Sequence, residues 1–88
     1  MDMKIIFTDH AKVKFKILKQ HGFKVNEKKV RDIVEKPDTK TKGKKDRFIV
    51  QGPVDENHVM RVVIEINDNI IKIITFYPAR RERYENQL

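Results

Sequence analysis

The residues best suited to chemistry lie near the end of the sequence, where an apolar run over residues 70–77 meets Pro78 and then three arginines between two tyrosines. Proline lacks the backbone N–H that a sheet ladder uses, so we expect Pro78 to end the strand and to place the arginines at the sheet edge. Guanidinium groups pair well with phosphate, and a tyrosine ring offers a stacking surface. A solvated tail of a basic domain is the alternative. The candidate RNA-binding residues of this segment are Arg81, Arg83 and Tyr84.

The remaining inventory is compatible with metal-free cleavage of RNA. The sequence contains no serine and no cysteine, so the usual covalent nucleophiles are absent. RNA carries its own nucleophile, the 2′-hydroxyl group, and needs only groups that stabilise the phosphorane and transfer protons. A cationic pocket on the sheet surface left open by the helices would provide them. The candidate catalytic residues are His10, Tyr77 and Arg80, and Arg61 is a further candidate for RNA binding.

Two of these candidates have structural alternatives. His10 falls in the first turn of a predicted helix, where it can serve as a hydrogen-bonding link between helix and sheet instead of a proton-transfer group. Arg61 lies on the mixed face of its strand, where it can be an edge charge or form an ion pair on the side of Glu65. The three histidines are scattered without carboxylate partners, and no glycine-rich phosphate loop is present, so we expect neither a metal site nor a cofactor.

Size and charge limit the possibilities further. A chain of 88 residues predicts a single domain over residues 1–88. The net charge of +7 favours polyanionic partners: nucleic acid first, and an acidic protein second. The family resemblance described below narrows the nucleic acid to RNA or the ribosome. The sequence shows no signal peptide, no apolar run that could span a membrane and no cysteine, so we expect a cytoplasmic protein without a membrane partner.

The apolar periodicity predicts the elements that must position these residues. A short strand at 4–7 precedes a helix that Thr8 or Asp9 caps and that ends at His21-Gly22. A second helix begins after Asn26 and closes at Lys36-Pro37. Both helices have one apolar face, so we expect them on the same side of a sheet.

Three further strands follow the helices. They are predicted at 47–51, 58–66 and 70–77, with a turn at 67–69, and the polar stretch 38–45 is expected to be a turn or a loop. In the second of these strands residues alternate between two faces, with Met60, Val62, Ile64 and Ile66 on one of them. The prediction is an α+β fold of order β-α-α-β-β-β, in which two N-terminal helices pack on one face of a small, mainly antiparallel sheet.

Short motifs along nearly the whole chain carry a family resemblance. They are Phe7-Thr-Asp-His-Ala11, His21-Gly22-Phe23, Val34-Glu-Lys-Pro37 and Tyr77-Pro-Ala-Arg80. The chain resembles a small uncharacterised prokaryotic family with F-T-x-H-A and Y-P-A-R motifs, which is itself similar to the RelE/ParE toxin superfamily and its BrnT-like branch. His10, Thr75, Tyr77 and Arg80 match the motif positions. Relatives often carry R-G where this chain has His21-Gly22, which puts a basic contact there in doubt.

The resemblance implies a RelE/ParE-like fold and the toxin of a type II toxin–antitoxin pair. The function expected from it is RNA binding, with metal-independent mRNA endonuclease activity and an acidic antitoxin as the protein partner. The alternative is a non-catalytic basic module that binds nucleic acid or an acidic protein, including ParE-like inhibition of gyrase, because the fold alone does not select the activity.

Overall fold

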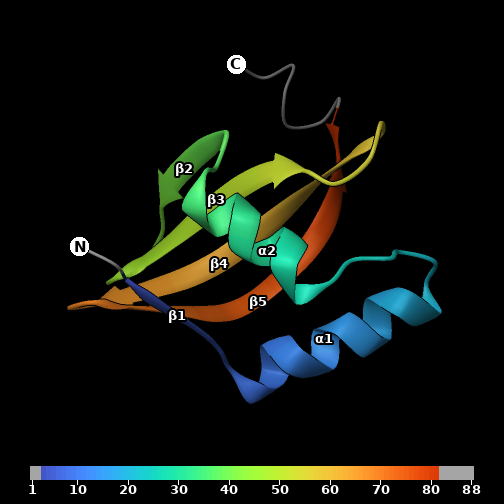
Figure 1. The fold of residues 1–88 in the computed structure, drawn as a ribbon. Helices are drawn as coiled ribbons and strands as arrows, with labels where there is room; N and C mark the ends of the chain where they lie inside the picture. The colour runs from blue at the N-terminus through green and yellow to red at the C-terminus, as the bar shows by residue number, and fades with distance from the viewer. Residues whose placement is uncertain (1–2, 82–88) are drawn as a thin grey trace.

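The structure, a computed structural model, describes residues 3–81. Two helices lie between a first strand and four consecutive strands (Figure 1). The elements are β1 (Lys4–Phe7), α1 (Asp9–Gln20), α2 (Glu27–Glu35), β2 (Thr39–Lys42), β3 (Arg47–Pro53), β4 (His58–Asn67) and β5 (Ile70–Arg80). The predicted α+β class with two N-terminal helices is confirmed, but the order contains one strand more than predicted.

The five strands form one mixed sheet in the order β1-β5-β4-β3-β2. Strands β2 to β5 are antiparallel neighbours in sequence order, whereas β1 pairs in parallel with the first part of β5. The first strand therefore joins the same sheet, as expected, and the two helices carry the chain from one edge of the sheet to the other.

Both predicted helix starts are confirmed by their caps. The Thr8 hydroxyl accepts the N–H of Ala11 at 3.1 Å and donates to the carbonyl of Ile74 at 3.0 Å. Asn26 accepts the N–H of Lys29 at 2.9 Å. Each cap satisfies an N–H that the helix itself leaves unpaired, and the Thr8 cap also fixes α1 to the middle of β5.

Both helices pack on the same face of the sheet, as Figure 1 shows. The Phe15 ring of α1 lies 4.7 Å from the Phe76 ring of β5, and α2 comes so close to β3 that a Cβ atom on Gly52 would meet Ile33 at 2.9 Å. The alternation predicted for β4 is confirmed at three core positions. The buried core consists of Ala11, Leu18, Val30, Ile33, Val34, Val50, Met60, Val62, Ile64, Ile73 and Phe76.

The expectation of a loop over residues 38–45 is wrong, because it contains strand β2. Thr39 to Lys42 pair with β3, and the ammonium group of Lys40 lies 4.5 Å above the Phe48 ring. Lysine is typical of edge strands, where charge discourages pairing with other chains, and its aliphatic stem can cover an apolar neighbour. The lysine-rich composition of residues 38–45 therefore led to the prediction of a loop where the edge strand β2 lies.

The expectation that Pro78 ends the last strand is also wrong. Strand β5 continues to Arg80, and Pro78 lies opposite Met60. Strand β1 pairs with residues 70–73 of β5, so within residues 3–81 β5 has a single neighbour, β4, at Pro78. A missing donor is tolerated at such an edge. Arg80 consequently belongs to the sheet and has a fixed register, which a solvated tail would not have.

Candidate functional site

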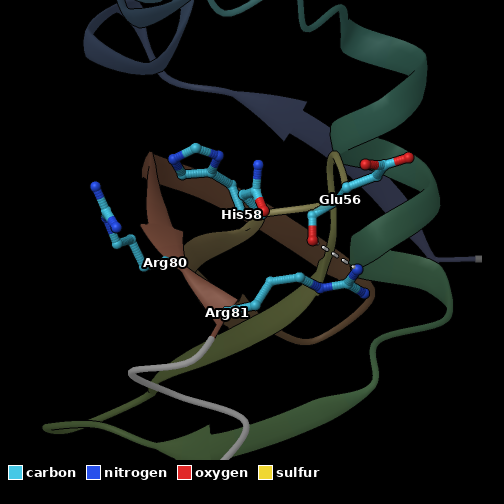
Figure 2. A pocket seen from close by; sticks show the side chains of 5 residues that line it. Glu56, His58, Arg80 and Arg81 are labelled. Carbon is cyan, nitrogen blue, oxygen red and sulfur yellow. Dashed lines mark hydrogen bonds between the residues drawn. The ribbon is translucent and has the colours of Figure 1, made fainter.

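A pocket of about 330 Å³ opens at the end of the sheet where the turn between β3 and β4 meets the end of β5. Figure 2 shows it from close by. Its lining residues are Glu56, Asn57, His58, Arg80 and Arg81. The antiparallel register places Arg80 opposite His58, so two residues far apart in sequence are direct cross-strand neighbours.

The His58 ring is held by a carboxylate. Its Nδ1 atom lies 3.0 Å from one carboxylate oxygen of Asp55 and 3.2 Å from the other, and the backbone N–H of Asn57 donates to the same carboxylate at 2.8 Å. Desolvation raises the pKa of the Asp55 carboxyl, but the hydrogen bonds from Asn57 and His58 lower it by more, so the pKa lies below its usual value. Asp55 is therefore ionised at neutral pH.

An ionised carboxylate only accepts hydrogen bonds, so the Nδ1 atom of His58 carries the proton that faces Asp55. In the neutral ring the Nε2 atom is then left with a lone pair and can accept a proton. The Phe23 ring packs edge-on against the His58 ring, with 5.1 Å between their centroids. Two neighbours thus fix the ring orientation, which is what a general base requires.

The two arginines of the pocket play different structural parts, because Arg80 is the last residue of β5 and Arg81 is the first residue after the strand. Arg80 is exposed and lies on the same side as His58, whereas Arg81 extends toward Glu56 (Figure 2). The Arg81 guanidinium donates to the Glu56 carbonyl at 3.4 Å, and its backbone N–H donates to the carbonyl of Asn57 at 3.0 Å. Arg81 therefore braces the turn that carries His58.

Two other predicted site residues, Arg61 and Tyr77, lie together away from the pocket. Arg61 donates from Nη1 to the Gln51 side-chain oxygen at 2.6 Å and from Nε to the Tyr77 hydroxyl at 3.2 Å. These three residues are neighbours in register across β3, β4 and β5. They form a row on the face of the sheet that the helices do not cover, since Arg61 and Tyr77 are each three positions from His58 and Arg80 and hence point the other way.

His10 lies in a third place. It is exposed in the first turn of α1, which Thr8 attaches to Ile73 and Ile74. Arg80 is six residues beyond Ile74 along β5, which corresponds to about 20 Å at roughly 3.3 Å per residue. The structure thus does not bring His10, Tyr77 and Arg80 together, and Arg83 and Tyr84 lie outside the described residues.

Basic residues from the first half of the chain gather near the His58 pocket. Hollows beside Phe23 and Val54 are lined by lysines of α1, of the loop between the helices and of α2. The lysines concerned are Lys16, Lys19, Lys24, Lys28 and Lys29. These five lysines therefore lie at the end of the molecule that carries His58, since Phe23 packs against the His58 ring and the Val54 N–H donates to the His58 carbonyl.

His58 was not among the residues that the sequence singled out, because it looks like an isolated histidine there. The signal that could have found it is the spacing Asp55-x-x-His58 directly before the strand predicted at 58–66. An aspartate at the start of a turn bends back to its own backbone, which brings its carboxylate toward a residue three positions on. Phe23 carried no such signal, because its packing against His58 joins segments far apart in sequence.

No cluster of three or more His, Cys, Asp or Glu side chains that could hold a metal ion occurs among residues 3–81. Within the same part of the chain, neither helix is long and apolar enough to cross a membrane. Comparison of the sequence and structure with family models, with curated proteins and with solved structures finds no match.

Proposed function

We propose that this protein is a toxin-like RNA-binding protein that cleaves mRNA without a metal ion, as the toxin of a type II toxin–antitoxin pair with an acidic antitoxin. The observation that carries the proposal is the His58 ring, which Asp55 orients at 3.0 Å beside the cross-strand neighbour Arg80. An oriented base next to a guanidinium group can supply the proton transfer and the charge stabilisation that favour metal-free cleavage of a phosphodiester with its own nucleophile.

In this mechanism the Nε2 atom of His58 accepts the proton of a 2′-hydroxyl group while the 2′-oxygen forms a bond to phosphorus. The P–O5′ bond breaks, its electron pair stays on the 5′-oxygen, and that oxygen takes a proton from water. The imidazolium ring then returns its proton to solvent. The products are a 2′,3′-cyclic phosphate and a 5′-hydroxyl end, so atoms and charge balance without any cofactor.

Arg80 supplies the electrostatic part of the reaction. A guanidinium group beside the phosphate stabilises the negative charge that develops on the phosphorane. Arg81 supports the site indirectly, because it holds the turn that carries His58. The net charge of +7 and the lysines near the pocket favour the approach of a polyanion.

The family resemblance supports the same assignment by an independent route, since it implies RelE/ParE-like toxins with RNA as a frequent target. The roles change, however. His58 takes the proton-transfer role that the sequence suggested for His10 or Tyr77, and Arg61 belongs to the row on the open face of the sheet.

The test is incubation of the purified full-length protein with end-labelled mRNA in EDTA, with and without ribosomes. We expect fragments that end in a 2′,3′-cyclic phosphate, and no cleavage at a position where a single 2′-deoxynucleotide replaces the ribonucleotide. Binding without cleavage in both formats would reassign the protein to the non-catalytic modules. Fragments that end in a 3′-hydroxyl group would contradict the mechanism.

A further inference from the structure

A second hollow, of about 520 Å³, adjoins the proposed active site. It lies between the second half of α1 and the loop that leads to α2. Its apolar part comes from Phe15, Phe23 and Val25, and its rim carries Lys16, Lys19 and Lys24. Small-molecule sites commonly have volumes of about 300–1,000 Å³ and combine apolar walls with a few polar groups.

We propose that this hollow binds one unpaired nucleobase of the RNA, immediately next to the phosphate that is cleaved. The proposal rests on the proposed function for the identity of the polymer. A base offers a flat apolar face to the rings of Phe15 and Phe23. Its flanking phosphates offer charge to the three lysines of the rim, as in other proteins that bind single strands through aromatic platforms in basic grooves.

The hollow and the pocket of His58 and Arg80 are linked by the ring of Phe23. Phe23 lines the hollow and also packs against the His58 ring, with 5.1 Å between the centroids at an angle of 89°. A base against one part of the Phe23 ring therefore lies beside the imidazole that faces the scissile phosphate. His58 and Arg80 are cross-strand neighbours on that same side of the sheet.

The inner wall of the hollow is rigid, which also suits the binding of a base. The Phe15 ring packs on Phe76 at 4.7 Å and on Phe7 at 5.6 Å, so the inner side of the platform is fixed by the core. A base can reach such a hollow only after it leaves the stack of a duplex. We therefore infer a preference for single-stranded RNA, with the nucleotide at the hollow contributing to the choice of cleavage position.

An acidic peptide with one apolar anchor is the competing occupant, because it also combines an apolar group with negative charge. The packing of Phe23 against His58 favours the nucleotide, since it joins the hollow to the pocket of His58 and Arg80. The two occupants predict different results in the same binding experiment.

The test uses the full-length protein and a short single-stranded 2′-O-methyl RNA that contains one 2-aminopurine. This probe has no free 2′-hydroxyl group, so binding is measured apart from cleavage. We expect stacking on the wild-type protein to change the 2-aminopurine fluorescence. Phe23→Leu keeps an apolar side chain but removes the ring, and should weaken binding by about 5- to 150-fold, the equivalent of one base–aromatic stack. Unchanged affinity and fluorescence in Phe23→Leu would overturn the proposal.

A second variant covers the case in which Phe23→Leu disturbs the fold. Lys16→Glu/Lys19→Glu changes only exposed side chains of α1. It should lower the dependence of log affinity on log salt by about 0.7 for each phosphate that the variant no longer binds. The matched control is Lys42→Glu/Lys44→Glu, at the opposite end of the sheet, with the same change of charge. Equal effects of the two pairs would contradict a local site.

A third experiment distinguishes a nucleobase from an acidic peptide as the ligand of the hollow. A glutamate-rich peptide with one phenylalanine is titrated while the NMR signals of Phe15 and Phe23 are followed. Shifts caused by the peptide but not by the oligonucleotide would overturn the proposal. Fluorescence changes that depend on Phe23, in a protein that cleaves no RNA, would instead uphold the base site and refute the proposed catalytic function.

Discussion

The open-face row and the pocket at the end of the sheet contain the same kinds of groups, yet they differ in what holds them. The row consists of Gln51, Arg61 and Tyr77, and the pocket contains His58 and Arg80. In the row, Arg61 donates to both neighbours within the regular sheet, and Gln51 is only 4% exposed. In the pocket, Arg80 is exposed and His58 is oriented by a turn outside the sheet.

Residue type alone therefore does not distinguish an arginine that is held within the sheet from one that is exposed at its end. Arg61 satisfies the amide of a buried glutamine, and a buried polar group without a partner is costly. Arg80 lies where the chain leaves the sheet, next to a base whose ring is fixed. The row is thus expected to stabilise the fold, and the pocket to act on RNA.

We expect the largest effect, a loss of RNA cleavage, from a substitution in the pocket. Arg80→Ala should lower kcat/KM for RNA cleavage by about 100- to 1,000-fold, because it removes a group that stabilises charge in the transition state. Its melting temperature should stay close to that of the wild type, since exposed exchanges usually change stability by about 0.5 kcal/mol or less. The control is Arg47→Ala, which removes the same charge from an exposed position at the other end of β3. If both variants lose activity equally, only the net charge matters.

We expect a smaller effect, on stability instead of activity, from a substitution in the open-face row. Arg61→Met retains a long apolar side chain but deprives the buried Gln51 oxygen of its donor. We expect the free energy of unfolding to fall by about 1–3 kcal/mol in urea titrations, with cleavage per folded molecule nearly unchanged. Arg47→Met, on the same face of the sheet, is the matched control. A variant that is fully stable but inactive would show that Arg61 belongs to the active site after all.

The smallest effect concerns the turn that orients His58. The folded pKa of Asp55 lies below the usual value of 3.8, so its contribution to stability is present above that pH and is lost as the pH falls through the folded pKa. We expect wild type to be more stable than Asp55→Asn at neutral pH, and the difference to vanish once the pH is below the folded pKa. Urea midpoints measured from neutral to strongly acidic pH check this, with Asp68→Asn in the turn between β4 and β5 as the control. A difference that is independent of pH would contradict the assignment of charge to Asp55.

Much of the fold followed from local signals. Thr8 and Asn26 provide their oxygens at the right distance before an apolar stripe, and the alternation in β4 separates a core face from an open face. Strand β2 was missed because its pairing with β3, rather than its own threonines and lysines, makes it a strand. Pro78 was misjudged because its tolerance depends on where β1 ends, which no local pattern contains.

The site was less predictable for a related reason. Arg61, Tyr77 and Arg80 were identified by type, but the face to which each points depends on the register between β4 and β5. That register contains an irregularity between Val63 and Ile64, where one strand holds an extra residue. The packing of Phe23 against His58 arises only because the helices and the loop between them lie against the sheet.

In the proposed reaction His58, and not Tyr77, transfers the proton. The most direct measurement is the single-turnover rate of RNA cleavage in EDTA by His58→Ala and by Tyr77→Phe, both verified as folded. We predict that His58→Ala slows cleavage by about 100- to 10,000-fold, the usual contribution of a general base, and that Tyr77→Phe cleaves at nearly the wild-type rate. Loss of cleavage in Tyr77→Phe with a normal rate in His58→Ala would contradict the account and move the active site to the open face of the sheet.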